Sequence, residues 1–140
     1  MGNVVDSLKN GVQCVVIGRL ERAIIDLLHL NRQECDILMW ADRLDHIEKH
    51  RNDFSGDFDK HISAIPEAIA NPDYVGLHPT NHSIEYIKRI DDLLIVVVRL
   101  KSTGNLAFRT AYPLTEKQLQ HYLSSGMVKK MKPETERIDK

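Results

Sequence analysis

The chain has 140 residues, a hydrophobic content of 42%, a charged content of 28% and a formal net charge of −1. These values predict one ordinary soluble domain with a single core, covering residues 1–140. No apolar run approaches the roughly 18–20 residues of a membrane helix, and the start lacks a signal-peptide pattern, so we expect a cytoplasmic protein with no membrane partner.

The first half of the sequence alternates short apolar runs with amphipathic segments. A strand is predicted at 12–17 and a helix at 20–30, and residues 35–40 are either another strand or a buried turn. Helices are predicted at 41–51 and 58–70, and Pro66 is expected to kink the second or start a fresh turn. The portion 1–35 therefore reads as an N-terminal strand and helix.

The stretch 83–112 is the most strongly patterned part of the chain. It predicts three strands, at 83–90, 93–98 and 106–112, joined by turns rich in Asp, Asn and Gly. The middle strand is apolar throughout, so we expect it to be buried on both faces. In the third strand, simple alternation places Leu106, Phe108, Thr110 and Tyr112 on one face and Arg109 on the other.

Together these elements predict an α+β fold. The N-terminal helices would pack on a C-terminal antiparallel β-meander of three to four strands, with 74–77 as the fourth, followed by a short helix from 114. Residues 129–140 are expected to form a flexible basic tail. Residues 1–73 carry a formal charge of −5 and residues 74–140 a charge of +4, so the sheet half is better suited to a polyanion.

Two histidines one helical turn apart stand out in the helix at 41–51. His46 and His50 lie on one stripe with Arg43, at the i, i+4 spacing that can chelate a metal or supply an acid and a base. The zinc-protease pattern needs a glutamate directly after the first histidine, where this chain has Ile47. A polar stripe without a chemical role is the remaining alternative.

The meander offers groups that could act on a phosphate. Thr110 and Tyr112 can donate from their hydroxyls, and Lys88 or Arg109 can supply a cation. Lys88 and Arg89 must point to opposite faces of the first strand, so only one of them can join a given site. We expect Lys88 to share a face with Thr110 and Tyr112, overlooked by the histidine helix.

Several motifs occur in a familiar order. They are His46-Ile47-Glu48-Lys49-His50, Asp53-Phe54, the Ile-Pro-x-x-Ile-x-x-Pro-Asp-Tyr-Val segment from Ile65 to Val75, Tyr86-Ile87-Lys88, the apolar strand from Leu94 to Val98, and Arg109-Thr110-Ala111-Tyr112. Over about residues 36–128 this pattern resembles the phage-associated nucleases of the Barnase–EndoU–colicin–RelE-like superfamily (the BECR fold), most closely their third family.

The resemblance implies a metal-independent endoribonuclease, toxin-like or prophage-borne, that binds RNA across a four-stranded meander and needs no cofactor. Its reaction would be attack of the ribose 2′-hydroxyl on the adjacent phosphorus, which leaves a 2′,3′-cyclic phosphate. His46 and His50 match the acid/base residues, Lys88 the strand cation, and Thr110 and Tyr112 the polar residues near the phosphate. Arg43 and Arg109 are added from geometry and charge as phosphate-binding residues.

The implied partners are RNA, with tRNA as one candidate, and an antitoxin or immunity protein. A non-catalytic module that binds RNA or a protein on the same fold is the main alternative. A metal-dependent hydrolase is a third, and EDTA would distinguish it.

Overall fold

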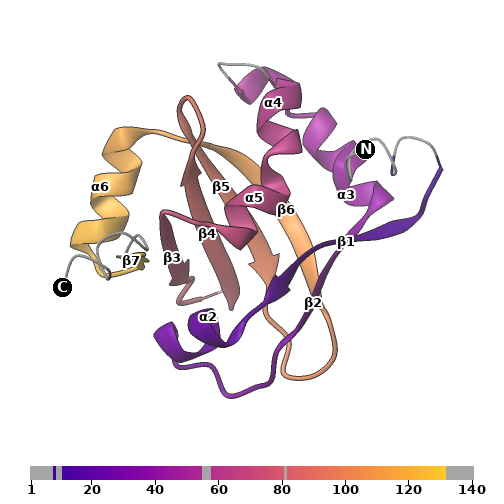
Figure 1. Ribbon diagram of the computed structural model, residues 1–140. Helices are drawn as coiled ribbons and strands as arrows, with labels where there is room; N and C mark the ends of the chain where they lie inside the picture. Colours follow the sequence, from indigo (N-terminus) through magenta and orange to yellow (C-terminus); the bar gives the residue numbers. More distant parts are fainter. Residues whose placement is uncertain (1–7, 9–10, 55–57, 81, 132–140) are drawn as a thin grey trace.

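The computed structural model describes residues 8, 11–54, 58–80 and 82–131, and it centres on one mixed β-sheet (Figure 1). Within these residues seven strands form the sheet, in the order β1-β2-β6-β5-β4-β3-β7. Their bounds are β1 Cys14–Leu20, β2 Cys35–Trp40, β3 Tyr74–Leu77, β4 Ser83–Arg89, β5 Leu93–Arg99, β6 Leu106–Leu114 and β7 Val128–Lys130. All neighbouring strands pair antiparallel except β2 and β6, which are parallel.

The predicted meander is confirmed as the centre of this sheet. Strands β4, β5 and β6 follow one another in the chain and pair antiparallel in sequence order. The middle strand has six buried residues in succession, from Leu93 to Val98, and only Arg99 is exposed. This burial follows from its continuous apolar sequence, since no polar side chain there needs water.

The predicted fold class is wrong in the extent of the sheet and in the placement of the helices. Strands β1 and β2 form an antiparallel ribbon that joins β6, and β3 and β7 extend the other edge. Helices are interspersed between strands: α2 (Arg22–Leu27), α3 (Ala41–Glu48), α4 (Phe58–Ser63), α5 (Ile65–Ala70) and α6 (Glu116–Ser124), with a 3₁₀ turn at Arg51–Asp53. The parallel β2–β6 pair joins segments almost 70 residues apart, which local patterns do not reveal.

The two faces of the sheet carry different helices, and they are named here by those helices. On the α5 face, Ile84, Tyr86, Leu94, Val96 and Val98 pack in one core with α5. On the α6 face, Ile87, Ile95 and Val97 pack with Leu119 and Tyr122 of α6. Figure 1 shows α5 crossing the near face of β4 and β5, with α6 beyond β3.

A β-bulge in β6 changes the predicted alternation. Val98 pairs with Phe108 but Val97 pairs with Thr110, so Arg109 is an extra residue in β6. Because the bulge interrupts the alternation, Phe108 lies on the α5 face while Thr110 and Tyr112 lie on the α6 face. The prediction that all three share a face is therefore wrong.

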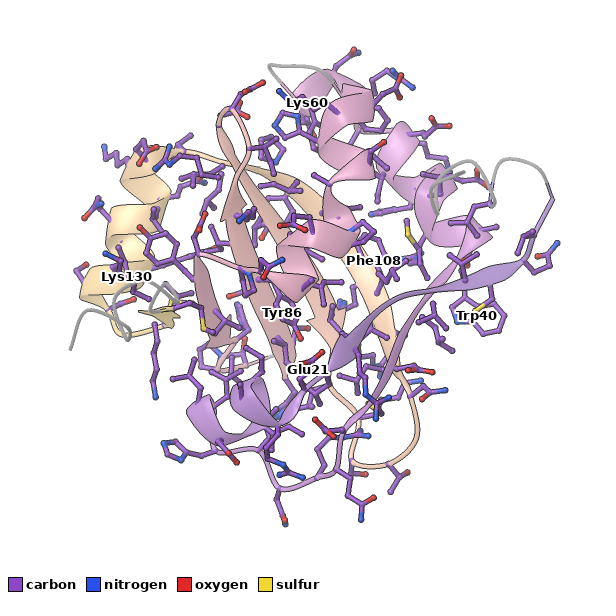
Figure 2. All side chains as sticks on the ribbon, viewed as in Figure 1. Glu21, Trp40, Lys60, Tyr86, Phe108 and Lys130 are labelled. Carbon is purple, nitrogen blue, oxygen red and sulfur yellow. The ribbon has the colours of Figure 1, made fainter. Side chains whose placement is uncertain are left out.

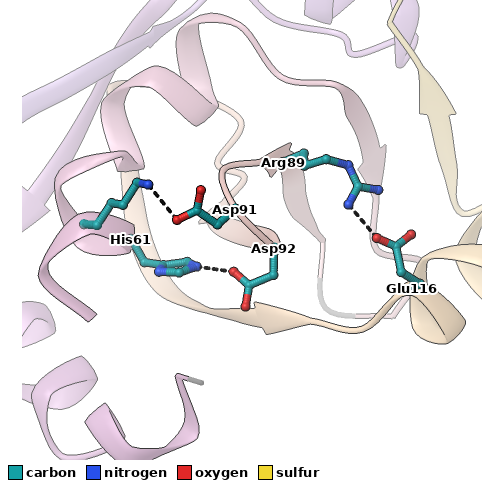
Figure 3. A network of polar contacts seen from close by, with 6 residues as sticks. His61, Arg89, Asp91, Asp92 and Glu116 are labelled. Atoms are coloured by element: carbon teal, nitrogen blue, oxygen red, sulfur yellow. Dashed lines mark hydrogen bonds and ion pairs between the residues drawn. The ribbon is translucent and has the colours of Figure 1, made fainter. Parts of the chain in front are cut away.

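Two ion pairs and one histidine–carboxylate contact hold helices to the ends of β4 and β5 (Figure 3). Lys60 and His61 of α4 reach Asp91 and Asp92 in the β4–β5 turn, at 2.6 and 2.5 Å. Arg89 of β4 reaches Glu116, in the first turn of α6, at 2.5 Å. These contacts fix α4 and α6 relative to the meander.

The boundaries of the predicted elements differ modestly from those in the structure. The segment predicted as one helix at 58–70 divides at Ala64 into α4 and α5, with Pro66 in the first turn of α5, as expected. Of the tail predicted at 129–140, Lys129 and Lys130 belong to β7, and 132–140 lie outside the described residues.

Candidate active site

One cross-strand row on the α6 face gathers the polar side chains of the sheet. Val97 pairs with Glu85 of β4 on one side and with Thr110 of β6 on the other. Paired residues in a sheet point to the same face, so Glu85 and Thr110 stand at one level with Val97 between them. Gly76 of β3 continues the row beyond Glu85.

Glu85 is a buried carboxylic acid at this level. Only 2% of its surface is exposed, and its Oε1 atom has no hydrogen-bond partner among the described residues. Burial raises the pKa of the Glu85 carboxyl above its ordinary value, and the nearby His78 offsets part of this increase. A buried acid with an unsatisfied oxygen is costly to keep, so such a group is a candidate for function.

Two tyrosines border Glu85. Tyr112 lies two residues after Thr110 on β6, on the same face, and is a neighbour of Tyr122 of α6. Burial, followed by the neighbouring Tyr122 and Glu85, raises the pKa of Tyr112 to about 12. The phenol is therefore protonated throughout the neutral range and is available as a hydrogen-bond donor.

Arg109 brings a positive charge to the same face. Its Nη1 atom donates to the Ser83 hydroxyl at 3.3 Å, and Ser83 precedes Glu85 by two residues on β4. Simple alternation predicted that Arg109 faces away from Thr110, but the bulge lets its side chain reach over the α6 face. Arg109 is exposed, so an anion could meet its guanidinium from solvent.

The histidine helix contacts β6 at the bulge. Arg43 Nη1 donates to the Arg109 carbonyl at 3.3 Å, and α3 packs beside β6. His46 is half-buried on the same side of α3, and its ring contacts His50 edge-on at a centroid distance of 5.2 Å. Burial, followed by the charges of Arg43, His50 and Lys49, lowers the pKa of His46.

A cleft lies between the 3₁₀ turn after α3 and Tyr112. It has a volume of about 630 Å³, and its lining includes Asp53, Asp92, Tyr112 and Glu116. His50 Nδ1 lies 3.5 Å from the Asp53 carboxylate, so this histidine stands beside the cleft. The structure thus brings Arg109, Thr110 and Tyr112 together on the α6 face. The histidine helix packs through Leu44 and Ile47 into the α5-face core, and Arg43 links it to the bulge of β6.

Lys88 lies elsewhere. It pairs with Leu94, which belongs to the α5 face, and its Nζ atom is 3.9 Å from the Asp73 carboxylate. We expected Lys88 to share a face with Thr110 and Tyr112, and the register instead puts it on the opposite face. The site expected from the sequence does not exist in that form.

The sequence analysis missed Glu85, Tyr122, Ser83 and His78. One signal could have found Glu85, since it alternates with Ile84 and Tyr86 in a strand next to a middle strand buried on both faces. A carboxylate at such a position is expected to be buried. The proximity of Tyr122 depends on how α6 packs, and no local pattern gives that.

Comparison with known proteins gives one match. The profile of the family described as phage-Barnase-EndoU-ColicinE5/D-RelE like nuclease3 matches residues 15–121, which is more than half of the chain. No curated protein and no solved structure matched. Among the described residues, no helix is both long and apolar enough to cross a membrane.

Proposed function

Because the chain belongs to the phage-Barnase-EndoU-ColicinE5/D-RelE like nuclease3 family, we propose that it is an endoribonuclease that acts on the α6 face of the sheet. The observation that carries the proposal is the buried Glu85 carboxyl, level with Thr110 and close to Tyr112. Internal phosphate transfer in RNA requires a general base and several hydrogen-bond donors to the phosphate oxygens, all on one face.

In the proposed reaction Glu85 takes the proton of a ribose 2′-hydroxyl. The 2′-oxygen then attacks the adjacent phosphorus, the bond to the 5′-oxygen of the next nucleotide breaks, and a 2′,3′-cyclic phosphate remains. Burial raises the pKa of Glu85, so its carboxylate is a stronger base than an exposed one. A base with a pKa nearer the working pH transfers protons more efficiently.

The developing negative charge on the phosphate oxygens needs donors. Arg109, Thr110 and Tyr112 are proposed to supply them, with Arg43 holding a neighbouring phosphate. The resemblance implied Lys88 as the strand cation, and our proposal gives that task to Arg109 because it reaches the α6 face. Donors already held by the sheet cost no rearrangement as the charge forms.

His46 and His50 are proposed to supply the proton for the departing 5′-oxygen. Of the two, His46 is favoured because it is half-buried beside Arg43, whereas His50 is exposed and already faces Asp53. Because the pKa of His46 is lowered from its ordinary value of 6.5, the protonated ring predominates only at a pH below 6.5. The proposal therefore places the fastest cleavage on the acidic side of neutral.

The test is incubation of the purified full chain with total RNA and with tRNA, in EDTA, followed by analysis of the product ends. The proposal predicts cleavage with 2′,3′-cyclic phosphate and 5′-hydroxyl ends. Cleavage abolished by EDTA would instead indicate a metal-dependent hydrolase. Salt-sensitive binding without cleavage would indicate a binding module. Preference for tRNA over total RNA would identify the substrate class further.

A further inference from the structure

The exposed large apolar side chains of the described residues are Val12, Val16, Trp40 and Tyr112. Tyr112 belongs to the candidate site. Trp40 is 48% exposed and Val16 is 54% exposed, on the ribbon formed by β1 and β2. Figure 2 shows Trp40 on the side of the molecule away from α6. Because Trp40 pairs with Cys14 and Val16 pairs with Leu38, the two exposed side chains are diagonal neighbours on the ribbon.

The strand register places this apolar surface on the α6 face. Trp40 pairs with Cys14, and Leu38 pairs with Val16. Leu38 also pairs with Ala107 of β6, which pairs in turn with Arg99 of β5, two residues beyond Val97. Paired residues share a face, so the apolar surface of the ribbon and the row containing Thr110 belong to the same side of one sheet.

The backbone register relates Trp40 to the bulge that carries Arg109. In the parallel register set by Leu38 and Ala107, Trp40 is the position level with Arg109. The strands part beyond Leu38, and α3 begins directly after Trp40, yet Arg43 of α3 still contacts the Arg109 carbonyl at 3.3 Å. The Arg43 guanidinium therefore lies at the bulge of β6, and the Arg109 guanidinium lies on the α6 face at Ser83 of β4.

We propose that Trp40 is a stacking platform for an unpaired base of single-stranded RNA bound at the candidate site. This inference depends on the proposed function. An aromatic ring on the same sheet face as an arginine guanidinium, here that of Arg109, is a combination that binds single-stranded nucleic acid, because bases stack on the ring and phosphates meet the cation. A duplex buries its base faces in its own stack, so it cannot use Trp40 in this way.

Trp40 is the only tryptophan of the chain, so its fluorescence reports on this position alone. The probe is a set of single-stranded 2′-O-methyl RNA oligonucleotides, which lack the attacking hydroxyl and remain uncut. We expect saturable quenching of the Trp40 emission by the single strands and little quenching by the same sequences as duplexes. Absence of quenching at concentrations where the oligonucleotide is bound, as measured by its own anisotropy, would overturn the proposal.

Substitutions test the role of the ring. Base stacking contributes about 1–3 kcal/mol, so Trp40→Ala should weaken single-strand binding about 5- to 150-fold, and Trp40→Phe should retain part of the affinity. Val16→Ser, in the same exposed surface, should change the affinity less than about twofold. An equal loss in Val16→Ser and Trp40→Ala would overturn stacking and indicate an apolar protein-docking surface.

Failure of this inference and failure of the proposed function would give different experimental results. If the wild-type chain cleaves RNA and Trp40→Ala has the wild-type KM on single-stranded RNA, stacking is excluded and the nuclease remains. If the oligonucleotide quenches Trp40 but no RNA is cleaved, the binding surface stands and the nuclease does not. Because Trp40 is largely exposed, its substitution should leave the thermal unfolding midpoint near that of the wild type.

Discussion

Glu85 of β4 and Thr110 of β6 lie at one level on the α6 face, with β5 between them, because each pairs with Val97 of β5. This relationship depends on the bulge at Arg109. If β6 alternated regularly through Arg109, Thr110 would share the face of Phe108 and would point into the α5-face core. The bulge thus brings a hydroxyl and a guanidinium to the buried carboxyl, as bulges near active sites commonly redirect side chains.

The first prediction concerns stability. In the folded chain Glu85 holds its proton more tightly than in the unfolded chain, because burial raises its pKa above the ordinary value of 4.5. The stability contributed by this group is therefore complete below about pH 4.5 and is lost as pH rises through the folded pKa. Glu85→Gln removes that loss, so it should unfold at a higher temperature than the wild type at pH 7 and at nearly the same temperature at pH 4.

Thermal unfolding at both pH values measures this difference, with Glu67→Gln as the matched control. Glu67 is exposed on α5, and its carboxylate accepts a hydrogen bond from Asn71 Nδ2 at 3.1 Å, so its substitution should change little. A Glu85→Gln variant less stable than the wild type at pH 7 would mean that the buried carboxylate is stabilising. The view of Glu85 as a group retained for function would then lose its basis.

Part of the fold was accessible from sequence because its signals are local. Apolar alternation and turn residues predicted β4, β5 and β6, and helical periodicity predicted α3 and α6. The bulge was not accessible, since one extra residue such as Arg109 leaves no mark in a strand that still alternates. The pairing of Leu38 with Ala107 and of Val128 with Gly76 depends on distant parts of the chain. Glu85 was missed as a site residue because its burial depends on this larger sheet.

The second prediction concerns the phenol of Tyr112. Tyr112→Phe removes one proposed donor to the phosphate, and loss of a single such donor commonly costs about 10²- to 10³-fold in kcat. Because the pKa of Tyr112 is about 12, ionisation of this phenol should not limit the wild-type rate up to about pH 10. Steady-state cleavage of a fluorescent RNA across this range measures both effects. A wild-type kcat in Tyr112→Phe would remove the residue from the mechanism.

The third prediction links Arg43 to His46. The charge of Arg43 is one of the causes that lower the pKa of His46, after burial. Arg43→Gln should therefore raise the pKa of His46 toward its ordinary value of 6.5, which NMR titration of the ring protons can follow without any activity. An unchanged His46 titration would contradict the proximity of these two side chains.

The fourth prediction concerns Gly76, which pairs with Glu85 on one side and Val128 on the other. A Cβ atom built there would lie 1.9 Å from the Met127 carbonyl oxygen, so Gly76→Ala must displace the backbone before β7. Overpacking of this kind costs about 1–3 kcal/mol or more, and chemical denaturation measures it. At Gly104 an added Cβ meets nothing, so Gly104→Ala should cost only the strain of its positive φ. Equal stability of Gly76→Ala and the wild type would contradict the close approach of the 127–128 backbone.

The central claim is that Glu85 removes the proton from the attacking 2′-hydroxyl. The most direct measurement is the cleavage rate of Glu85→Gln relative to the wild type on the same RNA, in EDTA, at saturating substrate. Loss of a general base predicts a rate about 10²- to 10⁴-fold lower, with RNA still bound and the Glu67→Gln control unchanged. A Glu85→Gln variant that yields cyclic phosphate ends at the wild-type rate would contradict the account.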